Sequence, residues 1–157
     1  MASIFASTIP AYAVGARANM EEWNAFSVTK EGASQLPFGA PVVAGTADRT
    51  GTLITAAGQN VLGIAQSVAT LPHPGDYYAQ YDTVSVVEYG CVGVLLGANV
   101  VAGAQARFNT VAGNWTSAAA SGTVLTIPGA QFDESGTSGA VGVVRYRRPV
   151  PSVSAGA

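Results

Sequence analysis

The side chains most often used in catalysis are scarce in this chain. Histidine, lysine and cysteine each occur once, at His73, Lys30 and Cys91. A histidine-based triad or a metal centre needs several such groups converging on one cleft, and His73 stands alone between two prolines. Lys30 does not follow the glycine-rich pattern of a phosphate-binding loop. We therefore predict no catalytic residue, no metal and no cofactor among these side chains.

Carboxylates are the remaining candidates for acid–base chemistry. Glu21 and Glu22 are adjacent in the chain, as are Asp133 and Glu134, and Asp76 lies in a polar loop. Such residues lack the convergent groups that an active site requires. The sequence therefore predicts a protein that is not an enzyme.

Residues 145–148 form the one basic cluster, with Arg145, Arg147 and Arg148 around Tyr146. On a strand, Arg145 and Arg147 would share one face. One interpretation is a solvated edge strand whose charges prevent pairing with other edges. The other is a salt-sensitive contact with an acidic surface on a partner.

The composition favours a protein that associates with other proteins. Charged residues make up 10% of the chain, against about 25% in ordinary soluble domains. A surface so poor in charge is typical of proteins that are covered by a partner or a repetitive assembly. The net charge of −2 argues against nucleic-acid binding. The longest apolar stretch, residues 91–104, is interrupted by Asn99 and glycines and is shorter than the ~20 residues of a membrane span, so we expect a soluble chain made in the cytosol.

Residues 1–36 differ from the rest of the chain and are predicted to form an extended N-terminal arm. Residues 18–26 are long enough for one or two helical turns, and no pattern indicates that the segment folds alone. One interpretation is a loose terminus, and the other is an arm that becomes ordered on another surface. Its aromatic anchors, which we predict to be contact residues, are Phe5, Tyr12, Trp23 and Phe26.

Residues 37–148 are predicted to form an all-β body, a small barrel or sandwich, followed by a tail at residues 149–157. Short apolar runs alternate with turns rich in Gly, Asn and Pro, which is typical of such folds. The predicted strands are residues 41–44, 51–55, 61–68, 83–89, 91–96, 104–110, 123–127 and 140–147.

The predicted centre of the body is a hairpin over residues 82–97 that turns at Gly90. Apolar and polar residues alternate before this glycine, whereas the run after it is apolar on both faces, as expected of a strand covered on both sides. We expect one continuous core that includes Val84, Val86, Val92, Val94 and Leu96. Cys91, on the opposite face, is expected to be a small buried side chain.

Several motifs occur in an order that resembles the structural cement, or capsid decoration, proteins of tailed bacteriophages. They are Leu36-Pro-Phe-Gly-Ala-Pro-Val-Val-Ala-Gly-Thr-Ala-Asp-Arg, Val61-Leu-Gly-Ile-Ala, Tyr78-Ala-Gln-Tyr-Asp-Thr-Val-Ser-Val-Val-Glu-Tyr-Gly, Val100-Val-Ala-Gly-Ala, Ile127-Pro-Gly-Ala-Gln-Phe and Ala140-Val-Gly-Val-Val. The resemblance implies a small β-barrel body with an N-terminal arm, bound to the outside of a capsid. It implies contact with the major capsid protein and self-association, as a trimer rather than a dimer, without catalysis, cofactor, nucleic acid or membrane. The basic cluster and the tail depart from the family pattern.

Two alternatives remain at this stage. One is another virion module, from a tail or fibre, although no stalk-like repeat is present. The other is a surface carbohydrate-binding domain, for which the only candidate cluster is Tyr77, Tyr78 and Tyr81 with Asp76 and Asp82. Tyrosine is also favoured at protein interfaces, so we interpret these side chains as core anchors or subunit contacts.

Overall fold

A computed structural model describes residues 13–67 and 75–149. The described residues form eleven strands and no helix, so the all-β prediction is confirmed. The strands are β1 (Asn24–Lys30), β2 (Leu36–Pro37), β3 (Pro41–Ala44), β4 (Thr50–Leu53), β5 (Val61–Ala65), β6 (Tyr77–Tyr78), β7 (Thr83–Leu95), β8 (Gln105–Asn109), β9 (Asn114–Thr116), β10 (Val124–Phe132) and β11 (Val141–Arg147). Nothing in residues 13–67 and 75–149 is a helix of the length and apolarity that a membrane crossing requires.

Five strands close into a mixed β-barrel, which we call the N-terminal barrel. Their order is β1-β4-β3-β5-β7, and β1 pairs with β7 to close the ring. The β1–β4 pair is parallel and the others are antiparallel. Closure leaves few free strand edges, which limits unwanted pairing with other chains.

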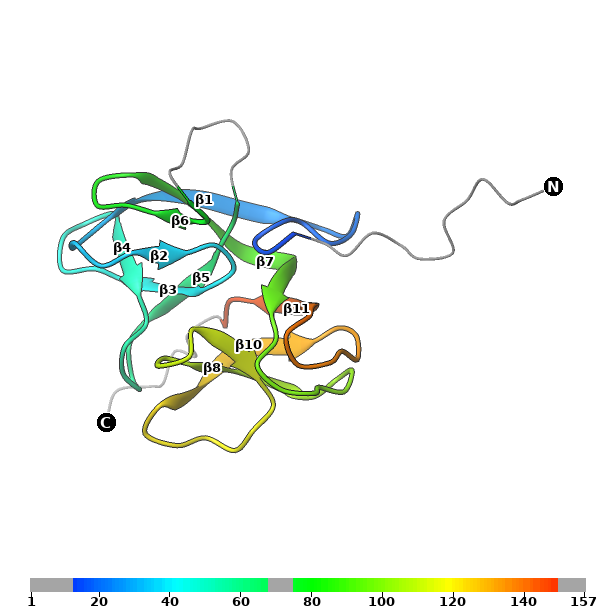
Figure 1. Cartoon of the computed structure of the whole chain (residues 1–157). Helices are drawn as coiled ribbons and strands as arrows, with labels where there is room; N and C mark the ends of the chain where they lie inside the picture. Colours follow the sequence, from blue (N-terminus) through cyan, green and yellow to red (C-terminus); the bar gives the residue numbers. More distant parts are fainter. Residues whose placement is uncertain (1–12, 68–74, 150–157) are drawn as a thin grey trace, which may run out of the picture.

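The second half of β7 belongs to another set of strands, which we call the C-terminal lobe. Its order is β7-β11-β10-β8-β9. A bridge between Leu96 and Trp115 brings β9 back toward the end of β7. Strand β7 therefore runs from the upper group of strands in Figure 1 into the lower group.

The predicted hairpin at Gly90 is wrong, because β7 is a single strand of 13 residues. Gly90 has φ of 141°, and a Cβ added there would lie 2.4 Å from Cε3 of Trp23. The pairing between β1 and β7 also shifts register between Asn24 and Ala25. Gly90 is thus needed because the Trp23 ring lies close to the strand. In the sequence alone, a glycine of this kind cannot be distinguished from one that forms a turn.

The core predicted from the alternation in β7 is confirmed. Val84, Val86, Val92, Val94 and Leu96 are each at most 1% exposed and belong to one cluster. The same cluster spans the barrel and the C-terminal lobe. Its largest fully buried side chains include Trp115, Tyr78, Tyr146, Phe108 and Phe132.

The predicted helical turns at residues 18–26 are wrong. The end of this stretch begins β1, which pairs with both β4 and β7 inside the barrel. Trp23 and Phe26 are half-buried and pack against the core. The strand residues 24–30 thus satisfy their backbone groups in the sheet, and tertiary pairing overrides local helix propensity.

The remaining strands show how local turn signals mislead. β10 runs through Pro128 and Gly129 to Phe132, whereas the prediction ended at residue 127. The chain accommodates these residues through a register shift between Thr126 and Gln131, with Gly129 at φ of 81°. β1, β2, β6 and β9 were not predicted, since three of them are only two or three residues long and β1 lacks clear alternation.

Candidate functional site

Residues 145–147 of the basic cluster lie on β11, which is an interior strand of the sheet, and Arg148 follows directly after it. β11 pairs with β7 on one side and with β10 on the other. The edge-strand interpretation is therefore wrong. Arg145 and Arg147 are exposed on one face and Tyr146 is buried on the other, as the alternation predicts.

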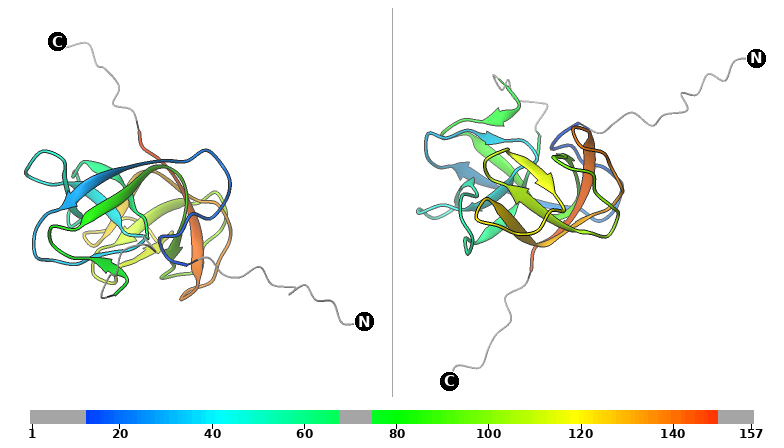
Figure 2. Two further views of the ribbon diagram at one scale, coloured as in Figure 1. Left: turned by 90° about the horizontal axis from the view of Figure 1, so that it is seen from above. Right: turned by 60° about the horizontal axis from the view of Figure 1, so that its bottom comes forward.

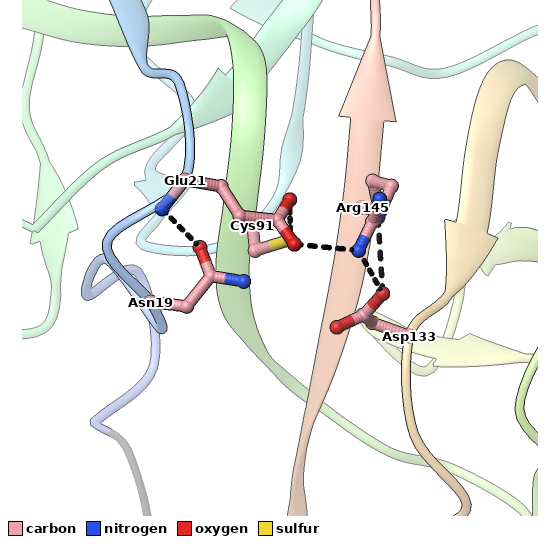
Figure 3. Close-up of polar contacts among 5 residues, drawn as sticks. All are labelled: Asn19, Glu21, Cys91, Asp133 and Arg145. Carbon is pink, nitrogen blue, oxygen red and sulfur yellow. Dashed lines mark hydrogen bonds and ion pairs between the residues drawn. The ribbon is translucent and has the colours of Figure 1, made fainter.

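Arg145 is engaged within the protein, as Figure 3 shows. Its Nη2 lies 2.9 Å from Oε1 of Glu21 and 2.7 Å from Oδ1 of Asp133. The hydrogen bond to Asp133 raises the pKa of the guanidinium. Two carboxylates thus share one arginine, which leaves it little capacity for a partner.

The Glu21 contact belongs to a segment that we call the N-terminal strap, residues 13–23. Gly15 N and Ala18 N donate hydrogen bonds to the carbonyls of Gly93 (2.7 Å) and Cys91 (2.9 Å), and Gly93 N donates to Ala16 O. The strap therefore runs along the side of β7 opposite β11. Cys91 lies beneath it, buried against Ala18 and Val143, and burial raises the pKa of its thiol.

Arg147 and Arg148 differ from Arg145. The Arg147 guanidinium lies 5.3 Å from the ring centroid of Tyr89. No described residue accepts a hydrogen bond from the Arg147 side chain or pairs with its charge. Arg148 Nη1 is 3.8 Å from Oε2 of Glu88, a long ion pair. These two arginines border a groove of about 650 Å³, also lined by Asn24, Gln59, Tyr89 and Pro128.

Tyr146 contributes to the interior. Burial raises its pKa to about 12, and its hydroxyl has no hydrogen-bond partner among the described residues. The side chain fills the core beneath the basic face and does not take part in the groove.

The aromatic residues predicted as anchors fall into two groups. Phe5 and Tyr12 lie outside the described residues. Trp23 packs over Gly90 and beneath the guanidinium of Arg17, which lies 5.2 Å from its ring centroid. Trp23 and Phe26 thus have clear intramolecular roles, and their contact with a partner stays a prediction.

The tyrosine cluster does not form an exposed platform. Tyr78 is fully buried and packs edge-on against Phe38, with centroids 5.1 Å apart, and Tyr77 is half-buried. Tyr81 is 78% exposed and has φ of 71°. Tyr78 is therefore a core anchor, and a sugar-stacking surface of three tyrosines is not present.

The described residues hold no group of three His, Cys, Asp or Glu side chains that would bind a metal ion. His73 lies outside the described residues. Lys30 is fully buried and its Nζ donates to the carbonyls of Glu31 and Gly32, and burial lowers its pKa. Its ammonium group therefore stabilises the turn that follows β1.

Sequence reasoning found the basic cluster but missed the groove and the strap. The groove joins residues that are far apart in the chain, from Asn24 to Pro149. The strap is irregular backbone whose only sequence signal was a run of small residues.

Comparison with known proteins identifies the family. Residues 2–147 match the family described as "Structural cement protein (E217 gp24/Pam3 gp6)". A chain of "The capsid of Myoviridae Phage XM1" has a similar fold, with a TM-score of 0.71 at 14% sequence identity, covering 92% of this chain and 96% of that one. No curated protein sequence matches significantly. Since the family match spans nearly the whole chain, this protein belongs to the phage structural cement protein family and is a non-enzymatic component of the phage capsid.

Proposed function

We propose that this cement protein binds the outer surface of the capsid, contacts the major capsid protein, and does so as a homo-oligomer, a trimer rather than a dimer. The observation that carries the proposal is the family match over residues 2–147. The charge-poor composition supports it, because a covered surface needs fewer solubilising charges.

Residues 1–12 are the proposed gripping segment. They precede the strap, which is anchored to β7 by backbone hydrogen bonds. Twelve residues reach at most about 40 Å when extended, far enough to contact a neighbouring subunit. Phe5 and Tyr12 are the proposed anchors, because buried aromatic side chains dominate binding energy at interfaces.

The test uses heads assembled without the cement protein, to which purified protein is added. We expect saturable binding of the full chain, and sharply reduced occupancy for a variant lacking residues 2–12 or carrying Phe5→Ala and Tyr12→Ala. Far-UV circular dichroism checks that these variants keep the β-body. Light scattering of the free protein tests for a trimer.

Absence of binding by the full chain would contradict the proposed function. Full occupancy by the truncated variant would contradict the role of residues 1–12 alone. A deletion of residues 2–30 is unsuitable, because it would remove all of β1 from the barrel.

A further inference from the structure

We propose that the groove beside Arg147 and Arg148 binds an extended acidic segment of the protein partner on the capsid. Arg147 and Arg148 would bind its carboxylates. This inference rests on the proposed function and names the chemistry of one contact.

The groove follows the boundary between the N-terminal barrel and the C-terminal lobe. The 650 Å³ groove and a second hollow of about 310 Å³ share Gln59, Val61 and Pro128 in their walls, so they adjoin each other, and we call the two together the channel. It begins beside β11 and continues past the turn between β4 and β5 to the first half of β10. An elongated channel of this kind fits a peptide better than a compact ligand.

One end of the channel carries the charge of Arg147, which no described carboxylate pairs. Arg147 has no acceptor among the described residues, and its guanidinium is oriented by stacking on Tyr89. The Glu88 carboxylate also lines the groove, where one oxygen accepts a hydrogen bond from Nδ2 of Asn24 and the other forms the long 3.8 Å pair with Arg148. An oriented guanidinium presents parallel N–H donors that match a carboxylate. Arg145, held by two carboxylates, offers the contrast on the same strand.

The other end of the channel offers a strand edge. Val124, Leu125 and Thr126 of β10 pair with β8 on one side, while β11 pairs only with residues 130–132 of β10. The described part of the chain places no strand on the remaining side of residues 124–126. On that side Ser121 already binds both main-chain groups of Val124, through its Oγ and its N–H, and Pro128 has no N–H. Thr126 is therefore the residue there whose main chain an extended segment can pair with, with its side chains against Val61 and Pro128. A nucleic acid would need a broader positive surface than two arginines provide.

The first experiment measures binding to heads assembled without the cement protein. Arg147→Gln and Arg148→Gln should each weaken binding about tenfold, because each removes charge-assisted hydrogen bonds to the partner's carboxylates. They should also reduce the dependence of binding on salt. Arg49→Gln, which removes the same charge from an exposed turn, should leave binding unchanged. Arg147→Lys should keep the salt dependence but not the full affinity.

The second experiment locates the partner. A photo-crosslinking amino acid at Gln59, in the channel, should couple to a capsid-protein peptide that contains Asp or Glu. The same amino acid at Val111, exposed on the β8–β9 turn, is the control.

If Arg147→Gln binds heads as tightly as the wild type and with the same salt dependence, this inference is overturned and the proposed function stays intact. Crosslinks from Gln59 to nucleic acid, to another copy of this chain, or to its own residues 150–157 would overturn it as well. Failure of the wild type to bind at all would instead contradict the proposed function.

Discussion

The Glu31 carboxylate ties the end of β1 to the turn between β3 and β4. It accepts hydrogen bonds from Thr46 N (2.8 Å) and from the hydroxyls of Thr46 and Thr50. The hydroxyl of Thr46 contributes most, and together these bonds lower the pKa of Glu31 to about 2. The ionised form is therefore favoured in the folded protein.

This shift predicts a pH dependence of stability. The pKa of Glu31 is lower in the folded than in the unfolded chain, so its stabilisation is complete above the unfolded value near 4.5 and is lost as pH falls toward 2. Glu31→Gln should lower the melting temperature at pH 7, and the difference from wild type should shrink between pH 4.5 and 2. Thermal melts across this range measure it, with Glu22→Gln, an exposed residue of the strap, as the control. A difference that stays constant with pH would contradict the role of the charge.

Gly90 allows β7 to pass close beneath Trp23. Its φ of 141° is unfavourable for other residues, and a Cβ would lie 2.4 Å from the indole ring. We expect Gly90→Ala to destabilise the protein by about 2–3 kcal/mol, measured by urea unfolding, because it combines backbone strain with overpacking.

A matched glycine separates the two causes. Gly58 also has positive φ, 81°, but a Cβ there would meet no atom within 4 Å. Gly58→Ala should therefore cost only the backbone term, about 1 kcal/mol. Combining Gly90→Ala with Trp23→Ala should give less than the sum of the two single effects. Equal losses at the two glycines would show that the ring contact is unimportant.

At the scale of elements, β7 tests the alternation that the sequence predicts. Val94 is fully buried, whereas the next residue, Leu95, is 41% exposed. Val94→Asp would bury an unpaired carboxylate and should abolish soluble expression, while Leu95→Asp should express and fold. Soluble yield and circular dichroism of the two variants measure the difference. A folded Val94→Asp protein would mean that the core is placed incorrectly.

The two exposed arginines of β11 differ in their partners within the protein. Arg145 and Arg147 lie on the same face of an interior strand, yet one is paired and the other is free of described acceptors. The strap supplies Glu21 to Arg145, while Tyr89 supplies only a ring face to Arg147. The neighbours of each arginine decide which of them can bind a partner.

At the scale of the whole molecule, the barrel and the C-terminal lobe share β7 and one core. Trp115 of the lobe also donates a hydrogen bond of 2.8 Å from Nε1 to the carbonyl of Gly39 beside the barrel. Figure 2 shows the two groups of strands packed against each other in both views. We therefore expect them to unfold together.

The two tryptophans can test this cooperativity. Trp23 packs against the barrel and Trp115 lies in the lobe. In Trp23→Phe the fluorescence reports on the lobe, and in Trp115→Phe it reports on the barrel side. In each variant, the fluorescence and far-UV circular dichroism midpoints in urea should coincide. Separate midpoints would mean that the halves unfold independently.

The sequence by itself determined the all-β class, the core face of β7 and the lack of catalytic groups. Alternation between Val84 and Leu96 is a local property, because successive side chains on a strand point to opposite faces. The order of motifs over residues 36–146 also carried the family resemblance, without any knowledge of contacts.

Only the tertiary structure decided that Gly90 lies within one strand and that β11 is interior. It also decided that Arg145 is paired while Arg147 borders a groove. Strand pairing, the strap and the groove depend on residues distant in sequence, such as Glu21 and Arg145. A glycine interrupts the apolar pattern in the same way whether it forms a turn or makes room for an aromatic ring. The role of Gly90 therefore becomes clear only from the position of Trp23 in the folded protein.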